Sequence, residues 1–459
     1  MISYDYKVKV CVVGLGPAGI GTTNTLSYSK LASSTLCLDV GKHQSNRSCP
    51  VLQNKRCMKC NPCEMISGFG GCSLLGGGKI SDFPAGRKLI NILGSYDMGR
   101  KKLLEGLNFF DNYLSLQKPN ITSNDIKIAS ELFKNLGFDY KYYDVYIYDQ
   151  EKLQMAYQKV FSQMRSAGMS ILLNTELTGI DCEEDGFKLV AKRGKESITI
   201  FTKYLVLGVG RLGRSMLKSL NAKLDLGGKE NHLDVGVRLE FPTDLYLDIT
   251  KYHNDLKLLF NDARTFCVCK DGRVAPYLLE DMFFTEGYYN LNDKSGFTNL
   301  GILIRLKRSR RNETIFDEIK QRLLQTSNGK PVCMMLDDYL GLSANNHDFS
   351  KRFDSSITFW VQSDINQCFP QPISTKIKEA TYYFASRLLP KDRWDEVNIF
   401  APQVDYTGLS FLVNSDFSII PRLYLIGDCS GRFRGILQAF CSGIICSESI
   451  IGGENETSL

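Results

Sequence analysis

The first residues with a recognisable chemical pattern follow a short apolar run near the N-terminus. Val8 to Val13 is rich in β-branched residues and predicts a buried strand, and Gly14-Leu15-Gly16-Pro17-Ala18-Gly19 comes directly after it. A helical stretch follows to about Ser29, and a second apolar run, Thr35 to Val40, carries Asp39 near its end. A G-x-G-x-x-G turn between a strand and a helix, with an acid about 20 residues further on, is the fingerprint of a dinucleotide-binding βαβ unit.

Each glycine of this turn has an expected role. Gly14 permits the tight turn, Gly16 lets a pyrophosphate approach the backbone, and Gly19 lets the helix pack closely on the strand. The helix N-terminus presents unpaired N–H groups to the phosphates. Asp39 is expected to bind the ribose hydroxyls of an adenosine. The alternative is a turn that merely packs well.

A second set of residues lies near the C-terminus and selects the dinucleotide. Leu423 to Asp428 is an apolar run that ends in an acid, and a helix is predicted to follow Gly435-Ile436. In flavoproteins with two dinucleotide-binding folds, which this arrangement resembles, such an acid binds the ribitol chain of FAD. The next helix directs its positive end toward the flavin pyrimidine. We therefore expect FAD rather than NAD, with an acid that only caps a terminal helix as the alternative.

A third glycine-rich segment, Gly208-x-Gly210-x-x-Gly213, resembles a second fingerprint for NAD. No β-branched strand with a terminal acid follows it at the required distance, so we do not assign a nicotinamide domain. We interpret the segment instead as the place where the chain returns to the FAD domain, with Arg211 close to the flavin. The electron donor or acceptor stays unassigned, and NAD(P)H is one candidate.

The residues expected to act on the cofactor or the substrate are spread over the chain. Cys72 and Lys79 lie in a glycine-rich loop expected near the isoalloxazine and are the candidate catalytic residues. Lys79 could donate toward N5 or a substrate oxygen, although a surface lysine that ends a glycine turn explains it as well. The expected FAD-binding residues are Gly14, Gly16, Pro17, Ala18, Gly19, Asp39, Lys42, Gly71, Gly208, Gly210, Arg211, Gly427, Asp428, Gly435 and Ile436.

Cysteines form a further pattern. The chain has 15, an odd number and too few for a secreted disulfide scaffold. Four of them, Cys49, Cys57, Cys60 and Cys63, lie close together in the sequence. A zinc site, an iron–sulfur cluster and a redox pair all fit this spacing. A loop of free cysteines is the fourth interpretation, and the residues alone leave all four open.

Cys267 and Cys269 stand two apart in a predicted strand, so they share one face. In a regular strand their Cα atoms would lie about 6.6 Å apart, near the upper limit for a disulfide. We therefore expect no bond between them. Packing in the core explains the shared face, and lining of the site is the alternative.

Composition and charge exclude several classes. There are 56 Lys and Arg residues against 50 Asp and Glu, and a net charge of +6 over 459 residues gives no argument for nucleic acid. The basic run Arg305-x-Lys307-Arg308-x-Arg310-Arg311 predicts a solvated loop, with a contact to an anionic substrate or to the phosphate of NADPH as the alternative. No signal peptide and no apolar stretch of about 18 residues are apparent, so we expect a cytoplasmic protein with no membrane partner.

The order of the predicted elements indicates an α/β protein. We expect a discontinuous, Rossmann-like FAD-binding domain formed by residues 1–100, 145–232 and 395–459. Residues 101–144 are predicted to be a helical insertion. Residues 233–394, with longer β-rich segments and aromatic insertions, are predicted to be an inserted α+β substrate domain.

Several motifs along the chain match one family. They are Cys49-Pro50-Val51-Leu52, Cys57-x-x-Cys60-x-Pro62-Cys63, Ser67-Gly68-Phe69-Gly70-Gly71, Gly210-Arg211-x-Gly213, Asp234-Val235-Gly236-Val237-Arg238-Leu239-Glu240, Arg264-Thr265-Phe266-Cys267-x-Cys269-x-x-Gly272-x-Val274, Gly427-Asp428 and Arg434-Gly435-Ile436-x-Gln438-Ala439. The chain resembles the uncharacterised bacterial FAD-dependent dehydrogenases, also described as NAD(P)/FAD-dependent oxidoreductases. These are distant relatives of glutathione reductase in the two-dinucleotide-binding-fold flavoprotein superfamily.

The chain departs from that family where the flavin is expected. Family members look like G-F-G-G-A-G-x-F-S-D-G-K, whereas this chain has Gly70-Gly71-Cys72-Ser73-Leu74-Leu75-Gly76-Gly77-Gly78-Lys79, which lacks the Asp and gains a Cys. Lys270 replaces the usual proline after Cys269. The resemblance therefore implies the cofactor without naming a substrate.

The sequence thus predicts an FAD-dependent oxidoreductase that transfers a hydride between an organic small molecule and flavin N5. A flavin reductase or monooxygenase charged by NAD(P)H is the first alternative. A non-catalytic binding protein on a flavoprotein fold is an alternative of another class.

Overall fold

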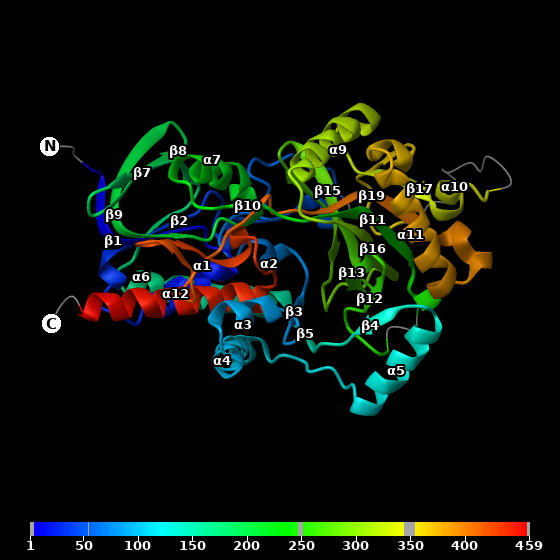
Figure 1. Ribbon diagram of the computed structural model, residues 1–459, viewed down its shortest axis with the longest axis horizontal. Helices are drawn as coiled ribbons and strands as arrows, with labels where there is room; N and C mark the ends of the chain where they lie inside the picture. The colour runs from blue at the N-terminus through cyan, green and yellow to red at the C-terminus, as the bar shows by residue number, and fades with distance from the viewer. Residues whose placement is uncertain (1–3, 54, 247–250, 344–353, 457–459) are drawn as a thin grey trace.

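Two eight-stranded sheets lie side by side in the computed structural model, which describes residues 4–53, 55–246, 251–343 and 354–456 (Figure 1). Helices pack on both sheets, so the protein is of the mixed α/β class, as predicted. The predicted ranges 1–100, 233–394 and 395–459 also include residues outside the described ones.

The first sheet has parallel strands at its centre. Its order is β21 (Ser418–Ile420), β22 (Leu423–Leu425), β9 (Glu196–Leu207), β1 (Tyr6–Val13), β2 (Thr35–Leu38) and β6 (Ser170–Leu172). All neighbours in this order are parallel except β21 and β22. An antiparallel hairpin, β7 (Glu176–Glu183) and β8 (Gly186–Arg193), extends from β9. The carboxyl ends of β1, β2, β9 and β22 therefore meet at one edge, where parallel sheets bind ligands.

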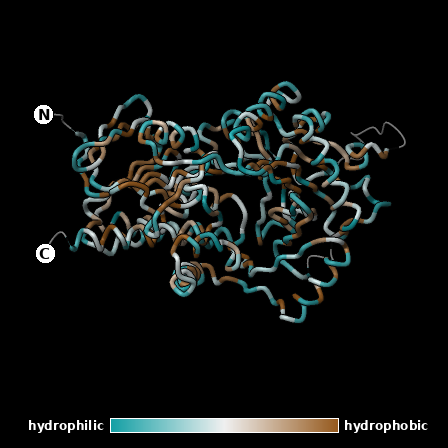
Figure 2. The backbone as a smooth tube through the Cα atoms, viewed as in Figure 1, coloured by the Kyte–Doolittle hydropathy of each residue, from teal (hydrophilic) through white to brown (hydrophobic). Residues whose placement is uncertain are grey.

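Strand β1 enters this sheet because its second half is apolar. Residues Val10 to Val13 are 0–5% exposed, and they pair on both sides with β2 and β9. Such burial on both faces is typical of a central parallel strand. Figure 2 shows the apolar segments gathered in the interior of the two sheets, while loops and helix exteriors are more hydrophilic.

The second sheet is mostly antiparallel. Its order is β18 (Val361–Gln362), β17 (Val332–Met335), β19 (Asn398–Asp405), β11 (Leu233–Pro242), β16 (Phe297–Leu306), β13 (Ala263–Cys269), β12 (Lys257–Phe260) and β4 (Asp139–Lys141). Two of these strands come from outside residues 233–394. Strand β4 pairs with β12, and β19 pairs with β11 and β17. The chain therefore crosses between the sheets more often than the predicted ranges imply.

Smaller elements complete the fold. The paired strands are β3 (Lys79–Ser81) with β5 (Val145–Ile147), β10 (Lys229–Glu230) with β20 (Leu409–Ser410), and β14 (Arg273–Leu279) with β15 (Met282–Tyr288). The helices beside the second sheet are α5 (Ser123–Asn135), α9 (Arg311–Ser327), α10 (Leu336–Leu340) and α11 (Ile373–Leu388). The others are α1 (Pro17–Leu26), α2 (Cys72–Leu75), α3 (Arg87–Leu93), α4 (Tyr96–Leu114), α6 (Gln150–Ser166), α7 (Arg214–Leu224) and α12 (Ile436–Glu456).

Helices α1 and α12, from opposite ends of the chain, pack against each other without side chains between them. A Cβ built on Gly21 would lie 2.2 Å from the carbonyl oxygen of Phe440, and one on Gly443 would lie 2.0 Å from that of Ala18. The Thr22 hydroxyl donates to the Gly443 carbonyl at 3.3 Å. Glycines at these positions let the two backbones touch.

Helix α12 is also long and apolar enough to span a membrane, by length and composition alone. Of its most apolar window, 56% is buried within the protein. Helices α1 and α4 pack against this helix, so packing in the core accounts for the buried part of its apolar surface.

The contact between α1 and α12 can be tested by filling it. We expect Gly443→Val to lower the free energy of unfolding by about 2–3 kcal/mol, because the new side chain overlaps the α1 backbone. The measurement is urea unfolding. Gly452→Ala is the matched control on the same helix, since a Cβ there meets nothing within 4 Å in the described chain. It should leave stability unchanged or raise it by up to about 1 kcal/mol. Equal losses in both variants would contradict the packing.

Candidate functional site

The glycine turn between β1 and α1 combines two crowded positions with one, Gly16, where a Cβ would make only an ordinary contact. Gly14 has a φ of +91°, and a Cβ on it would lie 2.4 Å from the Gly208 carbonyl oxygen. A Cβ on Gly19 would lie 1.9 Å from the Gly14 carbonyl oxygen. Around Gly16 the nearest described atom outside its own neighbours is the Cα of Gly71, 3.8 Å from such a Cβ. At the middle of the turn the backbones of Gly16 and Gly71 therefore face each other without side chains between them.

Helix α1 begins at this turn with its positive end free of side-chain caps. Gly16 is the N-cap residue and Pro17 is the first helical residue, and no side chain accepts a hydrogen bond from the first turn. The unpaired N–H groups of a helix N-terminus favour an anion. The glycine backbone and the helix end together suit a phosphate group.

The C-terminal segment reaches the same turn. A Cβ on Gly427 would lie 2.9 Å from the Cβ of Ala18 and 3.6 Å from that of Ala439. A Cβ on Gly208 would lie 3.3 Å from the Ile426 side chain. The structure therefore brings together the three glycine-rich segments that the sequence singled out, although they lie hundreds of residues apart.

Asp39 follows β2 and binds backbone amides with both carboxylate oxygens. Its Oδ2 accepts from the amide of Leu15 at 2.7 Å, and its Oδ1 accepts from the amides of Gly41 at 2.8 Å and Gly68 at 2.9 Å. The side chain is buried. Asp39 thus ties the glycine turn to two other loops, a structural role that the motif did not predict. Its predicted contact with a ribose stays a prediction.

Arg47 fixes the loop that faces the glycine turn. The buried guanidinium donates to the carbonyls of Phe69 and Gly71, both at 2.7 Å, and to that of Glu64 at 2.8 Å. Burial lowers the pKa of Arg47 to about 10, although the neighbouring Asp39 carboxylate opposes this shift. Sequence reasoning missed Arg47, because a lone arginine outside any motif gives no signal of its role.

Asp428 lies in the turn that follows β22, as predicted. Its Oδ2 is 3.4 Å from the Nε of Arg211, and the Nε of Arg434 is 3.8 Å from its Oδ1. Burial raises the pKa of the Asp428 carboxyl, and the charge of Arg211 opposes this. Within the described residues the buried Oδ1 has no hydrogen-bond partner. A buried acceptor without a donor is costly, so it suits a hydroxyl group of a ligand.

Arg211 joins this acid to the second sheet. Its Nη1 donates to the hydroxyl of Tyr277 at 3.3 Å, and its Nη2 is 3.8 Å from the Oδ1 of Asp405. Asp405 ends β19 and also pairs with Arg434. Gly210, which precedes Arg211, has a φ of +55°. The predicted flavin-side arginine therefore lies where the two sheets meet.

Helix α12 begins beside Asp428. Gly435 has a φ of +115° and is followed by Ile436, the first residue of the helix. Gln438, in the first turn, donates to the carbonyls of Ser81 at 3.0 Å and Ala85 at 3.3 Å. The N-terminus of this 21-residue helix, which carries the positive end of the helix dipole, therefore lies at Ile436, where the sequence predicted a helix to begin.

Cys72 is the first residue of α2 and is exposed. Its thiol nevertheless lies close enough to Arg211, Asp428 and Glu286 for their charges to affect its pKa. These three charged residues are half-buried. This placement is compatible with a catalytic role, which stays a prediction.

Lys79 is directed toward the second sheet. Its side chain is buried, and its Nζ donates to the carbonyl of Val268 at 2.5 Å and lies 3.6 Å from the Oδ1 of Asp255. Burial alone would lower the pKa of Lys79, but the Asp255 carboxylate together with Cys269 and Cys267 outweighs it and raises that pKa. Lys79 is therefore a paired ammonium rather than a surface lysine, and its catalytic role also stays a prediction.

The cysteine-rich segment holds four free thiols, Cys49, Cys57, Cys60 and Cys63. The Sγ of Cys63 accepts from the amide of Leu278 in β14 at 3.4 Å. In the described part of the chain, no three His, Cys, Asp or Glu side chains are placed to hold a metal ion. The predicted zinc site or iron–sulfur cluster at these cysteines therefore finds no support.

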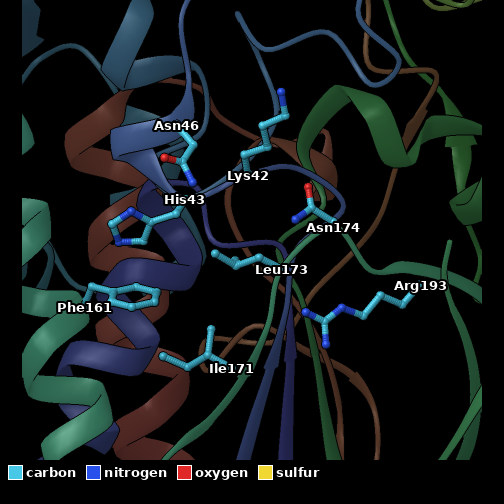
Figure 3. A pocket seen from close by; sticks show the side chains of 8 residues that line it. All are labelled: Lys42, His43, Asn46, Phe161, Ile171, Leu173, Asn174 and Arg193. Carbon is cyan, nitrogen blue, oxygen red and sulfur yellow. The ribbon is translucent and has the colours of Figure 1, made fainter.

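A cavity of about 510 Å³ opens at the carboxyl ends of β2 and β6 (Figure 3). Phe161, Ile171 and Leu173 form its apolar side, and the ring of His43 meets that of Phe161 edge-on at 4.4 Å. Its polar lining residues are Lys42, Asn46, Asn174 and Arg193. Lys42, a predicted cofactor ligand, forms an ion pair with Glu64. An apolar wall with cationic neighbours suits an aromatic ring that carries phosphates.

No family model matches the chain. One curated relative is 28% identical over 141 residues, the methylenetetrahydrofolate–tRNA-(uracil-5-)-methyltransferase TrmFO 1 of Mycoplasma mycoides. That match covers 30% of this chain and 30% of the relative. The chain therefore spans less than a third of the relative that it matches.

Three solved structures are similar over nearly the whole chain. They are a flavoprotein/dehydrogenase from Cytophaga hutchinsonii (TM-score 0.40, 9% identity, 98% of this chain and 79% of that one), a geranylgeranyl bacteriochlorophyll reductase-like protein from Thermoplasma acidophilum (0.41, 10%, 98% and 80%), and the p-nitrophenol 4-monooxygenase PnpA from Pseudomonas putida (0.38, 11%, 97% and 79%). Scores this low carry no argument about activity, so the function is argued from the site.

The anchoring role of Asp39 can be tested without any ligand. We expect Asp39→Ala to lower the free energy of unfolding by about 3 kcal/mol, because three buried amides lose their acceptor. Urea unfolding of protein freed of bound small molecules measures this loss. Glu131→Gln, an exposed change on α5, should stay within about 0.5 kcal/mol of the parent protein. A loss no larger than that of the control would show that the carboxylate does not hold the loops.

Proposed function

We propose that this protein is an FAD-dependent oxidoreductase that transfers a hydride between an organic small molecule and flavin N5. The observation that carries the proposal is the meeting of both chain ends at one glycine turn. There the glycine backbone at Gly16 and the uncapped start of α1 adjoin the segment that bears Asp428, whose Oδ1 has no hydrogen bond within the described residues. The specific resemblance to the bacterial FAD-dependent dehydrogenases is part of this proposal.

The residues present fit FAD. The Gly14–Gly19 turn would hold the diphosphate on backbone amides, and Asp428 would accept from a hydroxyl of the ribitol chain. The N-terminus of α12 at Ile436 would favour negative charge on the pyrimidine edge. When bound, FAD supplies a two-electron acceptor at N5.

We place the adenosine end of the cofactor toward the cavity beside β2 and β6. Lys42 lines this cavity three residues after Asp39, whose carboxylate keeps the loop between them in position through Gly41. Phe161 and Leu173 offer apolar contacts for a flat ring. The cationic Arg193 stands at the same cavity and suits the phosphate side.

The substrate would approach from the second sheet. Arg211 contacts both Asp428 and Tyr277, and the exposed Cys72 shares its surroundings with Arg211 and Glu286. Arg211 can orient an anionic or carbonyl group of a substrate and shield the charge of Asp428. The discontinuous Rossmann-like FAD-binding domain and the inserted substrate domain are likewise proposals, with β19 assigned by its pairing to the second sheet. A cytoplasmic location is proposed with them.

The role of Asp428 gives the first test. We expect Asp428→Ala to weaken FAD binding about tenfold or more, since a ribitol hydroxyl loses its acceptor. The ratio of flavin to protein absorbance after purification measures it, followed by titration with FAD. Asp181→Ala, at an exposed position on β7, is the control and should retain FAD as the parent does. Equal occupancy in both variants would show that the C-terminal assignment is wrong.

The reaction class gives the second test. A visible spectrum should show bound oxidised flavin, and a protein that stays colourless after addition of FAD favours the non-catalytic binding protein. Anaerobic mixing with NADH or NADPH then separates the enzymes. We expect no rapid bleaching, because no nicotinamide-binding fingerprint is present at residues 208–228. Rapid bleaching would replace the dehydrogenase with the flavin reductase or monooxygenase.

A further inference from the structure

Strand β13 is irregular at Cys267 and Cys269. Its pairing with β16 shifts between Phe266 and Cys269, where one extra residue enters β13. Cys267 adopts a φ of +47°, in the left-handed region that non-glycine residues seldom use. The two Sγ atoms lie 3.8 Å apart. The expectation of a regular strand is therefore wrong here, since a bulge turns both thiols toward each other.

Buried charged side chains hold the peptide between the two cysteines. Asp255 accepts from the amide of Val268 at 2.7 Å, and Lys79 donates to the carbonyl of the same residue at 2.5 Å. Arg238, which is 0% exposed, donates to the carbonyl of Cys267 at 3.0 Å. Three ionic side chains thus fix a strained backbone, which is typical of functional sites rather than of simple packing.

Strand β15 lies against the two cysteines through the backbone of Gly287. A Cβ on Gly287 would lie 2.7 Å from the Sγ of Cys269 and 3.0 Å from the carbonyl oxygen of Cys267. A larger residue at this position would overlap the Cys269 sulfur, so the backbone of β15 can approach the cysteine pair only at a glycine. Cys267 is half-buried and Cys269 is buried, so Cys267 is the more exposed residue of the pair.

The surroundings favour one negative charge on the pair. The S–H of Cys267 lowers the pKa of Cys269 to about 7, and the charges of Lys79 and Arg238 act in the same direction, against burial. The pKa of Cys267 is raised correspondingly, first by its hydrogen bond to Cys269 and then by burial. Two coupled thiols of this kind share one proton near neutral pH, so either sulfur can act as the thiolate.

We propose that Cys267 and Cys269 form a redox-active dithiol that reduces organic disulfides and closes to a disulfide itself. Cys267 passes its proton to Cys269 and attacks, as a thiolate, one sulfur of the external disulfide; the thiolate that leaves takes this proton from Cys269. The Cys269 thiolate then attacks the Sγ of Cys267 and displaces the second half of the external disulfide as a thiolate. Two electrons pass from the cysteines to the external disulfide, and one intramolecular S–S bond forms. The site does not depend on the proposed flavin function.

The closing step needs little movement. A disulfide requires an S–S distance of about 2 Å, so side-chain rotation over roughly 2 Å joins the two sulfurs. The bulge has already brought the Cα atoms out of the regular-strand geometry. The positive charges of Lys79 and Arg238 stabilise the thiolate that each attack requires.

Trypsin provides a direct assay, because Arg264 and Lys270 place both cysteines in one short peptide, Thr265–Lys270. The full-length protein is equilibrated in glutathione buffers of rising oxidised fraction, trapped with N-ethylmaleimide and digested. We expect this peptide to change from the doubly labelled form to an unlabelled form that lacks both thiol hydrogens. The buried thiols of Cys333 and Cys368 serve as internal controls and should stay reduced.

Two variants sharpen the result. Cys267→Ser should abolish the unlabelled form, and Cys333→Ser, the matched control, should leave the transition unchanged. The pH at which half of the cysteine pair reacts with N-ethylmaleimide should rise above about 7 in Lys79→Met. The reason is that this variant loses a positive charge near the Cys269 thiolate.

Persistence of both labels in the most oxidising buffer would overturn the proposal. Accumulation of a glutathione adduct without ring closure would overturn it as well. The unmodified protein decides these points, so the proposal is testable even where a variant does not fold.

Discussion

The backbone contact between the first turn of α1 and the C-terminal segment is the interaction on which the rest of the site depends. Gly443 and Gly427 both lie against Ala18, and Gly14 lies against Gly208 at the end of β9. Close approach at these points leaves no room for side chains, so three distant segments are held at one edge of a parallel sheet. The uncapped start of α1 and the carboxylate of Asp428 become neighbours only because these backbones touch.

Buried ionic side chains hold the loops that carry no regular structure. Asp39 and Arg47 do this around the glycine turn, and Arg238 with Lys79 does it around the bulge in β13. In each case backbone groups accept or donate hydrogen bonds, and Lys79 and Arg238 are also paired with the carboxylates of Asp255 and Glu286. Groups of this kind are costly to bury without such partners, so each one specifies a particular loop conformation.

Local sequence patterns predicted the parts of the site that depend on local geometry. The glycine turn, the acid after β22 and the start of α12 were located because each follows a strand and precedes a helix or turn. Contacts that join distant segments were not predictable in this way. Nothing near Arg47 indicates that it binds Gly71, and the spacing of Cys267 and Cys269 predicts a regular strand unless the extra residue opposite β16 is known. Strand β19 was likewise hard to assign, since its partners lie far away in the chain.

Asp405 has a consequence for the mechanics of the molecule. It is the last residue of β19, yet its carboxylate meets Arg211, Arg264 and Arg434, which come from both halves of the structure. A single carboxylate therefore forms ion pairs with arginines of both sheets. Because Arg211 also pairs with Asp428, Asp405 couples the end of β19 electrostatically to the turn that follows β22.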